Sequence, residues 1–215
     1  MIDKKIAIID YGLGNMFSIK QAFNKVGIDT IVTSDAEIIG KSDAIVLPGV
    51  GAFGDAMKCL QNLNLIEPIQ LFAKTGKPFL GICLGMQLLF NNSEEFGNHV
   101  GLGLIEGEIK KFNFSEIEGE SIKIPQIQWN QIYHKGNYSW EGTCMSEIEN
   151  NSYMYFVHSY FAIPKDEKLI LTYSQYANLE YCSSVKKDNI TGIQFHPEKS
   201  GELGINIYKN WIIKE

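Results

Sequence analysis

The chain has 215 residues, of which 45% are hydrophobic and 20% charged, so it can bury one sizeable core and is not disordered as a whole. We expect a single domain over residues 1–215. The net charge is −6, and all 19 cationic side chains are lysines. The lack of arginine argues against a nucleic-acid binder and removes the usual bidentate partner of a substrate carboxylate or phosphate.

The four cysteines lie far apart and form no Cys-x-x-Cys pair, so we expect neither a structural zinc site nor a disulfide framework. The first residues lack the apolar core of a signal peptide. The longest nearly apolar stretch, residues 78–90, is about thirteen residues long, short of the ~20 that cross a bilayer. The segment Gly12-x-Gly14 lacks the third glycine of a dinucleotide-binding loop. We therefore expect a cytoplasmic protein with no metal and no cofactor.

The first half of the chain alternates the signals of strands and helices. Short apolar or β-branched runs predict strands at residues 6–10, 28–33, 44–47 and 78–82. Apolar residues recurring every three or four positions predict helices at residues 16–26, 55–63, 66–74 and 84–90. Such alternation favours a parallel sheet with helices on both faces.

The second half, after Gly97, reads differently. Antiparallel strands or hairpins are expected at residues 101–114, 121–132, 153–163, 169–177 and 180–185. One more strand is expected at residues 190–195, and a closing helix at residues 203–213. Both halves together predict an α/β fold built on a mixed sheet.

The sharpest local signal is Gly81-Ile82-Cys83-Leu84-Gly85. An apolar strand ends here, a cysteine stands between two glycines, and a helix begins, which is the cysteine version of a nucleophile elbow. The turn would place the thiol at a helix N-terminus, which favours the thiolate, and would aim the N–H of Leu84 at a developing oxyanion. The competing interpretation is a buried structural cysteine, the usual fate of a free one.

A cysteine nucleophile needs a base, and the base needs an orienting group. His196 follows the strand predicted at residues 190–195, and Glu198 lies two residues further on. If the backbone stays extended, the two side chains share a face, and the carboxylate can fix the imidazole tautomer. Taken singly, a surface histidine and a solvated charge explain these residues equally well.

A third segment, Leu47-Pro48-Gly49-Val50-Gly51-Ala52-Phe53, also follows a predicted strand. Its glycines allow close approach to a ligand and offer a second backbone N–H for an oxyanion. Without the cysteine elbow, an ordinary β–α turn would be the default interpretation.

Five motifs in the chain carry a family resemblance: Asp10-Tyr11-Gly12-Leu13-Gly14-Asn15, residues 47–53, residues 81–87, Tyr155-Phe156-Val157-His158-Ser159-Tyr160 and Gln194-Phe195-His196-Pro197-Glu198-Lys199-Ser200-Gly201. Together they resemble the class I glutamine amidotransferases, and within that class the glutaminase subunits of imidazole glycerol phosphate synthase. The resemblance covers nearly the whole chain. It implies a flavodoxin-like open mixed sheet and hydrolysis of L-glutamine to glutamate and ammonia.

The resemblance also implies roles for individual residues. Cys83 would be the nucleophile, His196 the proton shuttle and Glu198 the group that orients the imidazole. The oxyanion would be bound by N–H groups of Leu84 and of the Val50–Gly51 segment. The substrate would be held by Gly49, Gln87, Glu95, Ser159 and Tyr160, with Glu95 meeting its ammonium group and the Ser159–Tyr160 backbone meeting its α-carboxylate.

A partner is implied as well. In the family, ammonia passes through an internal channel to a cyclase barrel subunit of the HisF type, which forms a heterodimer with the glutaminase and activates it. The resemblance places that interface around Asn15, Gln128, Trp129, Asn130 and Lys199. A tryptophan in the core is the alternative interpretation of Trp129.

One segment departs from the family. Residues 124–130 contain Gln126 and Gln128 where histidine-pathway proteins usually read Pro-His-x-Gly-Trp-Asn. Paralogues in surface-polysaccharide synthesis supply ammonia to a sugar amidotransferase, and one sequence does not separate these two destinations. A non-catalytic regulatory or binding subunit and a cysteine peptidase of the same fold are further alternatives. The presence of all three expected catalytic residue types argues against the former, and the extended family match argues against the latter.

Overall fold

The computed structural model describes residues 4–114, 122–136 and 139–214. Its strands are β1 (Ile6–Ile9), β2 (Thr30–Thr33), β3 (Ala44–Leu47), β4 (Phe79–Ile82), β5 (Phe90–Ser93), β6 (His99–Val100), β7 (Ile105–Lys111), β8 (Gln126–Ile132), β9 (Ser152–His158), β10 (Tyr160–Pro164), β11 (Ile170–Tyr176), β12 (Leu179–Lys187) and β13 (Ile190–Ile193). Its helices are α1 (Met16–Lys25), α2 (Ala36–Lys41), α3 (Phe53–Asn62), α4 (Ile66–Ala73), α5 (Leu84–Leu88) and α6 (Gly201–Lys214), with 3₁₀ turns η1 (Glu167–Leu169) and η2 (Pro197–Lys199).

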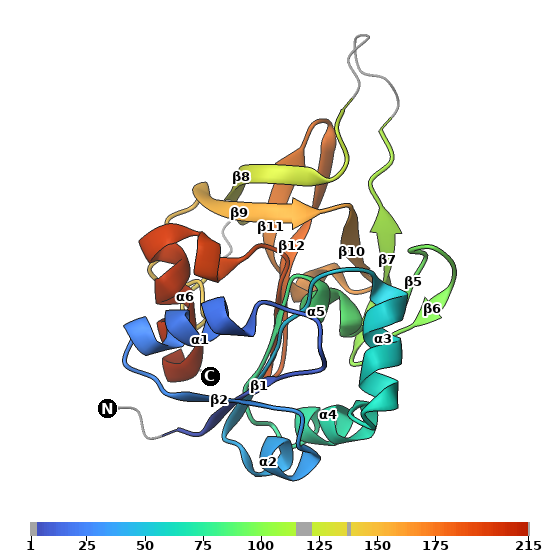
Figure 1. Cartoon of the computed structure of the whole chain (residues 1–215). Coiled ribbons are helices and arrows are strands. Elements are labelled where there is room, and N and C mark those ends of the chain that lie inside the picture. Colours follow the sequence, from blue (N-terminus) through green and yellow to red (C-terminus); the bar gives the residue numbers. More distant parts are fainter. Residues whose placement is uncertain (1–3, 115–121, 137–138, 215) are drawn as a thin grey trace.

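Among these residues the strands form an 11-stranded mixed sheet and a separate pair, β8 with β9 (Figure 1). The order in the large sheet is β2-β1-β3-β4-β13-β12-β10-β7-β5-β6, with β11 beside β12. Neighbours from β2 to β13 run parallel, and β12 with β13 begins the antiparallel part. The expected α/β fold with an open mixed sheet is confirmed.

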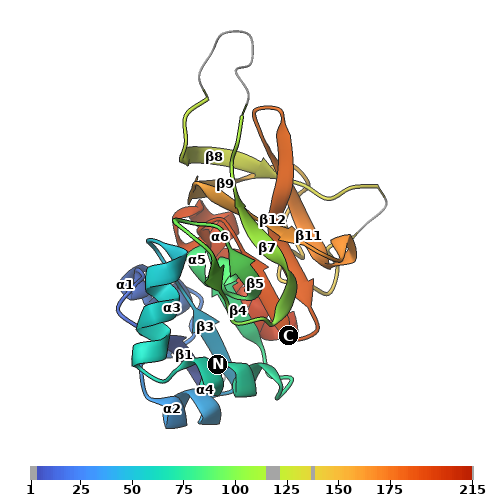
Figure 2. The same ribbon diagram turned by 90° about the vertical axis from the view of Figure 1, so that its right-hand side faces the viewer.

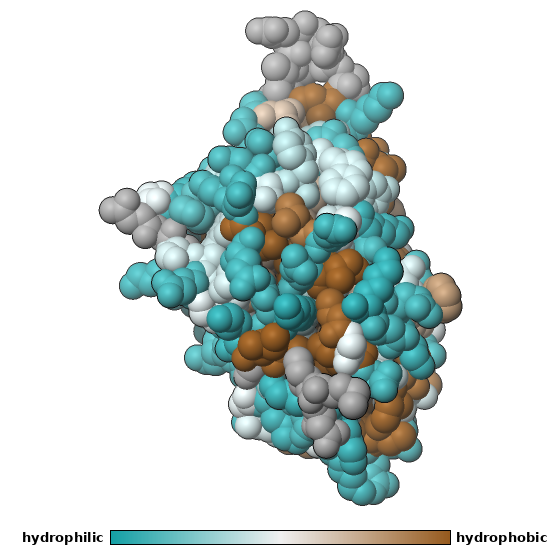
Figure 3. Space-filling view, turned by 90° about the vertical axis from the view of Figure 1, so that its left-hand side faces the viewer, coloured by the Kyte–Doolittle hydropathy of each residue, from teal (hydrophilic) through white to brown (hydrophobic). Residues whose placement is uncertain are grey.

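Two hydrophobic cores fill the space on the two faces of the sheet, because successive strand residues point to opposite faces. Ile6 and Ile8 of β1 pack with α1 and α6, whereas Ala7 and Ile9 pack with α3 and α4. Figure 2 shows the pair of strands β8 and β9 lying above this layered body. On the face covered by α1 and α6, apolar side chains show among mostly hydrophilic ones (Figure 3). No helix in the described ranges is both long and apolar enough to span a bilayer.

The topology also explains why the site forms where it does. Strands β3, β4 and β13 are adjacent and parallel, since β4 pairs with β3 on one side and with β13 on the other. The carboxyl ends of parallel strands meet at one edge of the sheet, which is where open α/β folds bind their ligands. The segments that leave these three strands are the glycine loop after Leu47, the Cys83 turn and the His196 segment.

Several predicted elements are wrong in detail. The helix predicted at residues 84–90 ends at Leu88, and Phe90 starts β5 instead. The reason is tertiary, because the carbonyl of Leu89 accepts hydrogen bonds from the N–H groups of Leu104 (2.8 Å) and Ile105 (3.0 Å), which draw the chain into the sheet. No helix was predicted from the sequence where α2 lies. The segment predicted at residues 121–132 begins at a residue that lies outside the described ones.

The segment 153–163, predicted as an antiparallel strand or a hairpin, forms two strands that lie in different sheets. His158 of β9 pairs with Gln126 of β8, whereas Tyr160 of β10 pairs with Lys111 of β7. Ser159 stands between them, and its carbonyl accepts a hydrogen bond from the N–H of Phe112 at 3.0 Å. Alternating hydrophobicity does not reveal such a change of partner, because both strands keep the same period.

Candidate active site

Cys83 occupies a strained turn between β4 and α5. Its backbone has φ 55° and ψ −112°, a region that non-glycine residues rarely adopt, and its N–H donates to the carbonyl of Ile193 at 2.7 Å. Such strain persists only where the surroundings enforce it, as at a nucleophile elbow. The elbow predicted from the sequence is confirmed as a local structure.

The two glycines of the elbow are required by close packing. A Cβ on Gly85 would lie 1.8 Å from the carbonyl oxygen of Leu47, and one on Gly81 would lie 2.8 Å from the carbonyl oxygen of Gly85. The strand, the turn and the helix therefore approach more closely than any side chain permits.

His196 and Glu198 form a buried pair beside Cys83. Nδ1 of His196 donates to Oε1 of Glu198 at 2.8 Å, and the two side chains are 6% and 1% exposed. The predicted pairing is confirmed, but the extended backbone predicted for it is wrong. Residues Pro197–Lys199 form the 3₁₀ turn η2, so the carboxylate reaches the ring by folding back.

The electrostatics of the imidazole follow from its neighbours. Burial lowers the pKa of His196, but Cys83 and the Glu198 carboxylate outweigh that effect and hold the pKa well above its usual value of 6.5. The other ring nitrogen, Nε2, is buried and, among the described residues, carries no hydrogen bond that would compete with Cys83. The arrangement places a protonated imidazole, which can give up its proton from Nε2, next to the sulfur.

A pocket of about 260 Å³ opens over Cys83. Most of the residues predicted for the site line it: Val50, Gly51, Cys83, Leu84, Gln87, Glu95, Ser159, Tyr160 and His196. Pro125, Val157 and His158 complete the wall. Residues from six separate stretches of the chain thus meet around one sulfur.

Gly49 is the predicted substrate residue that the pocket wall does not include. It is buried under the loop, where an added Cβ would lie 2.5 Å from the hydroxyl of Tyr11 and 2.9 Å from Cβ of Leu84. The Tyr11 hydroxyl in turn donates to the carbonyl of Pro48 at 2.8 Å. In this structure Gly49 allows the loop to pack against the elbow.

Gln87 and Glu95, which both line the pocket, are held in place by hydrogen bonds. Nε2 of Gln87 donates to the carbonyl of Tyr160 (3.0 Å) and to Oε1 of Gln194 (2.9 Å). Oε2 of Glu95 accepts from the N–H of Phe53 at 2.6 Å. Burial raises the pKa of Glu95, although the N–H of Phe53 opposes this by favouring the charged form.

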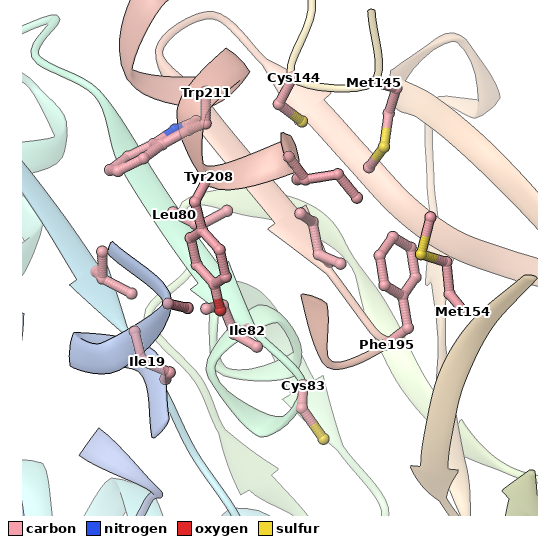
Figure 4. Packing of buried hydrophobic residues seen from close by; sticks show 14 of the residues in the cluster. Ile19, Leu80, Ile82, Cys83, Cys144, Met145, Met154, Phe195, Tyr208 and Trp211 are labelled. Carbon is pink, nitrogen blue, oxygen red and sulfur yellow. The ribbon is translucent and has the colours of Figure 1, made fainter. Parts of the chain in front are cut away.

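Three neighbours of the site were not predicted from the sequence. Tyr208 of α6 donates to Oε2 of Glu198 at 3.1 Å, and Figure 4 shows its hydroxyl pointing toward the end of β4 that carries Cys83. Nε2 of Gln194 lies 3.7 Å from Sγ of Cys83. The carbonyl of Tyr155 accepts from the N–H of His196 at 2.9 Å. The only general rule that could have pointed to them is that buried tyrosines and glutamines need hydrogen-bond partners for their polar groups.

The predicted interface residues are divided by the pleat of β8. Trp129, which is 49% exposed, pairs with Tyr155 of β9, and Nζ of Lys199 lies 5.7 Å from the centre of the Tyr155 ring. Gln128 and Asn130 point to the other face, because successive strand residues alternate. An exposed Trp129 excludes the alternative of a core tryptophan. Asn15 is exposed and caps α1 by accepting from the N–H of Ser18.

Comparison with known proteins decides the family. The family described as glutamine amidotransferase class-I matches residues 7–214. The chain belongs to the class I glutamine amidotransferases. Two solved structures share the fold at low identity: a glutamine amidotransferase (TM-score 0.72, 14% identity, 97% of each chain) and PurLQS from Thermotoga maritima (TM-score 0.72, 16% identity, 98% of each chain).

Relatives within the class I glutamine amidotransferases are similar over nearly their full length. A protein from Sulfurimonas denitrificans is 47% identical over 206 residues, covering 96% of each chain. One from Geobacter sulfurreducens is 45% identical over 208 residues, covering 96% of this chain and 97% of its own. Both are named imidazole glycerol phosphate synthase subunit HisH. Within the class, the chain therefore groups with the HisH subunits.

Proposed function

We propose that this protein is a HisH-type glutaminase that hydrolyses L-glutamine to L-glutamate and delivers the ammonia to a synthase partner in histidine biosynthesis. The observation that carries the proposal is that Cys83 and His196 line one pocket, with Glu198 hydrogen-bonded to His196, in a chain 47% identical to a HisH subunit. The thiol chemistry needs a reducing compartment such as the cytoplasm, and Cys83, Cys59 and Cys182 are free thiols.

The chemistry begins with the Cys83 thiolate, which attacks the side-chain amide carbon of glutamine. The negative charge that develops on the amide oxygen is bound by the N–H of Leu84 and by an N–H of the Val50–Gly51 segment. His196 then gives its proton to the departing ammonia, which leaves a thioester on Cys83.

The second half of the reaction releases glutamate. His196 takes a proton from water as the water attacks the thioester, and the same N–H groups bind the second oxyanion. The proton taken from water returns His196 to its charged form, and collapse of that intermediate breaks the C–S bond, which releases glutamate and regenerates the thiolate. Glu198 keeps Nδ1 of His196 protonated, so that Nε2 is the atom that moves protons in both steps.

Recognition of the substrate uses the rest of the pocket. Glu95 pairs with the α-ammonium group, the Ser159–Tyr160 backbone receives the α-carboxylate, and Gln87 contacts the chain between the two ends. Gly49 shapes the loop above the elbow. This arrangement suits a chain without arginine, because a zwitterion can be held by one carboxylate and by backbone amides.

Free ammonia becomes ammonium in neutral water and loses its nucleophilic electron pair, so an internal channel to a HisF-type barrel subunit would protect it. We propose that the heterodimer interface contains Trp129 with Lys199, together with Asn15, Gln128 and Asn130. Trp129 is the kind of exposed aromatic that anchors interfaces.

The test compares two cysteine variants in the complex with the barrel subunit. Cys83→Ala should abolish glutamate release while the complex still uses added ammonium salt, and Cys59→Ala, on α3, should behave like the wild type. A glutamine analogue with an electrophilic carbon should label residue 83 in the wild type and in Cys59→Ala, and should leave Cys83→Ala unlabelled. Glutamate release by Cys83→Ala would refute the proposal. Stimulation by a sugar amidotransferase, and not by the barrel subunit, would assign the ammonia to polysaccharide synthesis instead.

A further inference from the structure

His158 is a buried histidine that the proposed chemistry does not use. It ends β9, is 6% exposed and directly precedes the Ser159–Tyr160 wall of the pocket. The rings of Phe112, Phe156 and Tyr181 surround it, with centroids 5.1, 5.7 and 5.3 Å from its own. Burial lowers its pKa to about 4, against an opposing effect of the Tyr160 carbonyl, so the ring is neutral near pH 7.

Hydrogen bonding fixes the tautomer of this neutral ring. Nδ1 lies 2.9 Å from the carbonyl oxygen of Tyr160, which can only accept, so Nδ1 carries the proton. Nε2 is then an acceptor, and its neighbour is the hydroxyl of Tyr181 at 3.3 Å.

Gln126 of β8 lies on the other side of Tyr181. The Tyr181 hydroxyl donates to Oε1 of Gln126 at 3.0 Å. The buried ring of His158 is therefore held at Nδ1 by the Tyr160 carbonyl, with the Tyr181 hydroxyl beside its other nitrogen.

The Tyr160 carbonyl joins His158 to the pocket wall. It accepts from His158 at 2.9 Å and from Nε2 of Gln87 at 3.0 Å, which uses both of its lone pairs. The carbonyl of Ser159 is held as well, by the N–H of Phe112. The peptide planes of this corner between the two sheets therefore have no freedom to rotate while these bonds last.

We propose that His158 is a positioning residue, which by donating from Nδ1 to the Tyr160 carbonyl holds the Ser159–Tyr160 backbone in the geometry that receives the α-carboxylate of the substrate. The inference rests on the proposed glutaminase function and adds a residue that acts through its neighbour. It predicts that His158 affects binding of the α-carboxylate of glutamine and does not affect the reaction at the side-chain amide.

The experiment uses two substrates in the complex with the barrel subunit. Glutamine carries the α-carboxylate, whereas 4-aminobutanamide keeps the amide and the amine but lacks that group. In His158→Leu we expect kcat/KM for glutamine to fall about tenfold, mainly through KM, and kcat/KM for 4-aminobutanamide to change less than about twofold. His158→Asn, whose side-chain NH₂ can donate from the position of Nδ1, should restore most of the loss.

The control is His134→Leu, which removes a half-buried histidine outside the pocket and should leave both substrates unaffected. An equal fall for both substrates in His158→Leu, or no fall for glutamine, would overturn the proposal. Nitrogen NMR of the wild type tests it without any variant, because His158 should be the neutral Nδ1–H tautomer, and the Nε2–H tautomer would contradict it. If the wild-type complex releases no glutamate at all, the proposed function fails instead.

Discussion

The hydroxyl of Tyr208 donates a hydrogen bond to Oε2 of Glu198 at 3.1 Å. The other oxygen of that carboxylate accepts from His196, so the tyrosine holds the group that holds the imidazole. Tyr208 comes from α6 and is fully buried, packed against Phe23 of α1 with ring centroids 4.7 Å apart. The core behind the sheet therefore reaches directly into the site.

Tyr208→Phe removes this hydrogen bond and keeps the ring. Hydrogen bonds to charged groups contribute more than neutral ones, so we expect kcat/KM for glutamine to fall roughly tenfold, with the pH profile of kcat/KM displaced. Steady-state kinetics across pH measures both effects. Tyr176→Phe, which removes a tyrosine hydrogen bond to the carbonyl of Lys123, is the control and should leave the profile in place. An unchanged profile in Tyr208→Phe would deny the hydroxyl this role.

Gly85→Ala should destabilise the fold, because the new Cβ would lie 1.8 Å from the carbonyl oxygen of Leu47 and the backbone would have to move. We expect a loss of about 3 kcal/mol or more in the free energy of unfolding. Gly40→Ala in α2 is the matched substitution, since nothing lies within 4 Å of its added Cβ, and it should stabilise the helix by up to about 1 kcal/mol. Urea unfolding of both variants decides the matter, and equal effects would contradict the packing argument.

Trp129→Ala should weaken binding of the barrel subunit about tenfold or more, because exposed aromatic anchors dominate interface energies. Titration of the partner, followed by calorimetry, measures the change. Phe96→Ala removes an aromatic side chain that is 86% exposed on the segment between β5 and β6, and it should not affect the affinity. If the two variants bind equally well, Trp129 lies outside the interface.

Acid should destabilise the protein through His158. Its pKa is about 4 in the folded protein and 6.5 ordinarily, so the unfolded chain takes up a proton first as the pH falls. The stability that His158 contributes is therefore present above pH 6.5 and is lost between 6.5 and about 4, by at most about 3 kcal/mol. Urea unfolding at pH 7 and pH 5 should show a larger loss for the wild type than for His158→Asn. Identical losses would mean that His158 does not titrate as described.

The turn at Cys83 was predictable because the signals for it are local. A glycine on each side of a cysteine at a strand end specifies a tight turn, and His196 follows its strand in the same way. Parallel strands bring their carboxyl ends to one edge, so the three segments were expected to meet. The pairing of His196 with Glu198 was also predicted, although the 3₁₀ turn that achieves it was not.

Other features depend on packing between distant parts of the chain. Leu89 could have continued a helix, but two N–H groups from the next strand claim its carbonyl. Nothing in residues 153–163 marks Ser159 as the point where the chain changes sheets, because a strand has the same side-chain period in either sheet.

The sequence by itself determined which residues carry the reactive groups and at which strand ends they stand, since steric demands on glycine and the periods of helices and strands act between near neighbours. Only the tertiary structure decided which groups hold them. Tyr208 is remote in the sequence from Glu198, as Tyr160 is from Gln87, and a buried polar group takes whatever partner the packing of the core brings within hydrogen-bond distance.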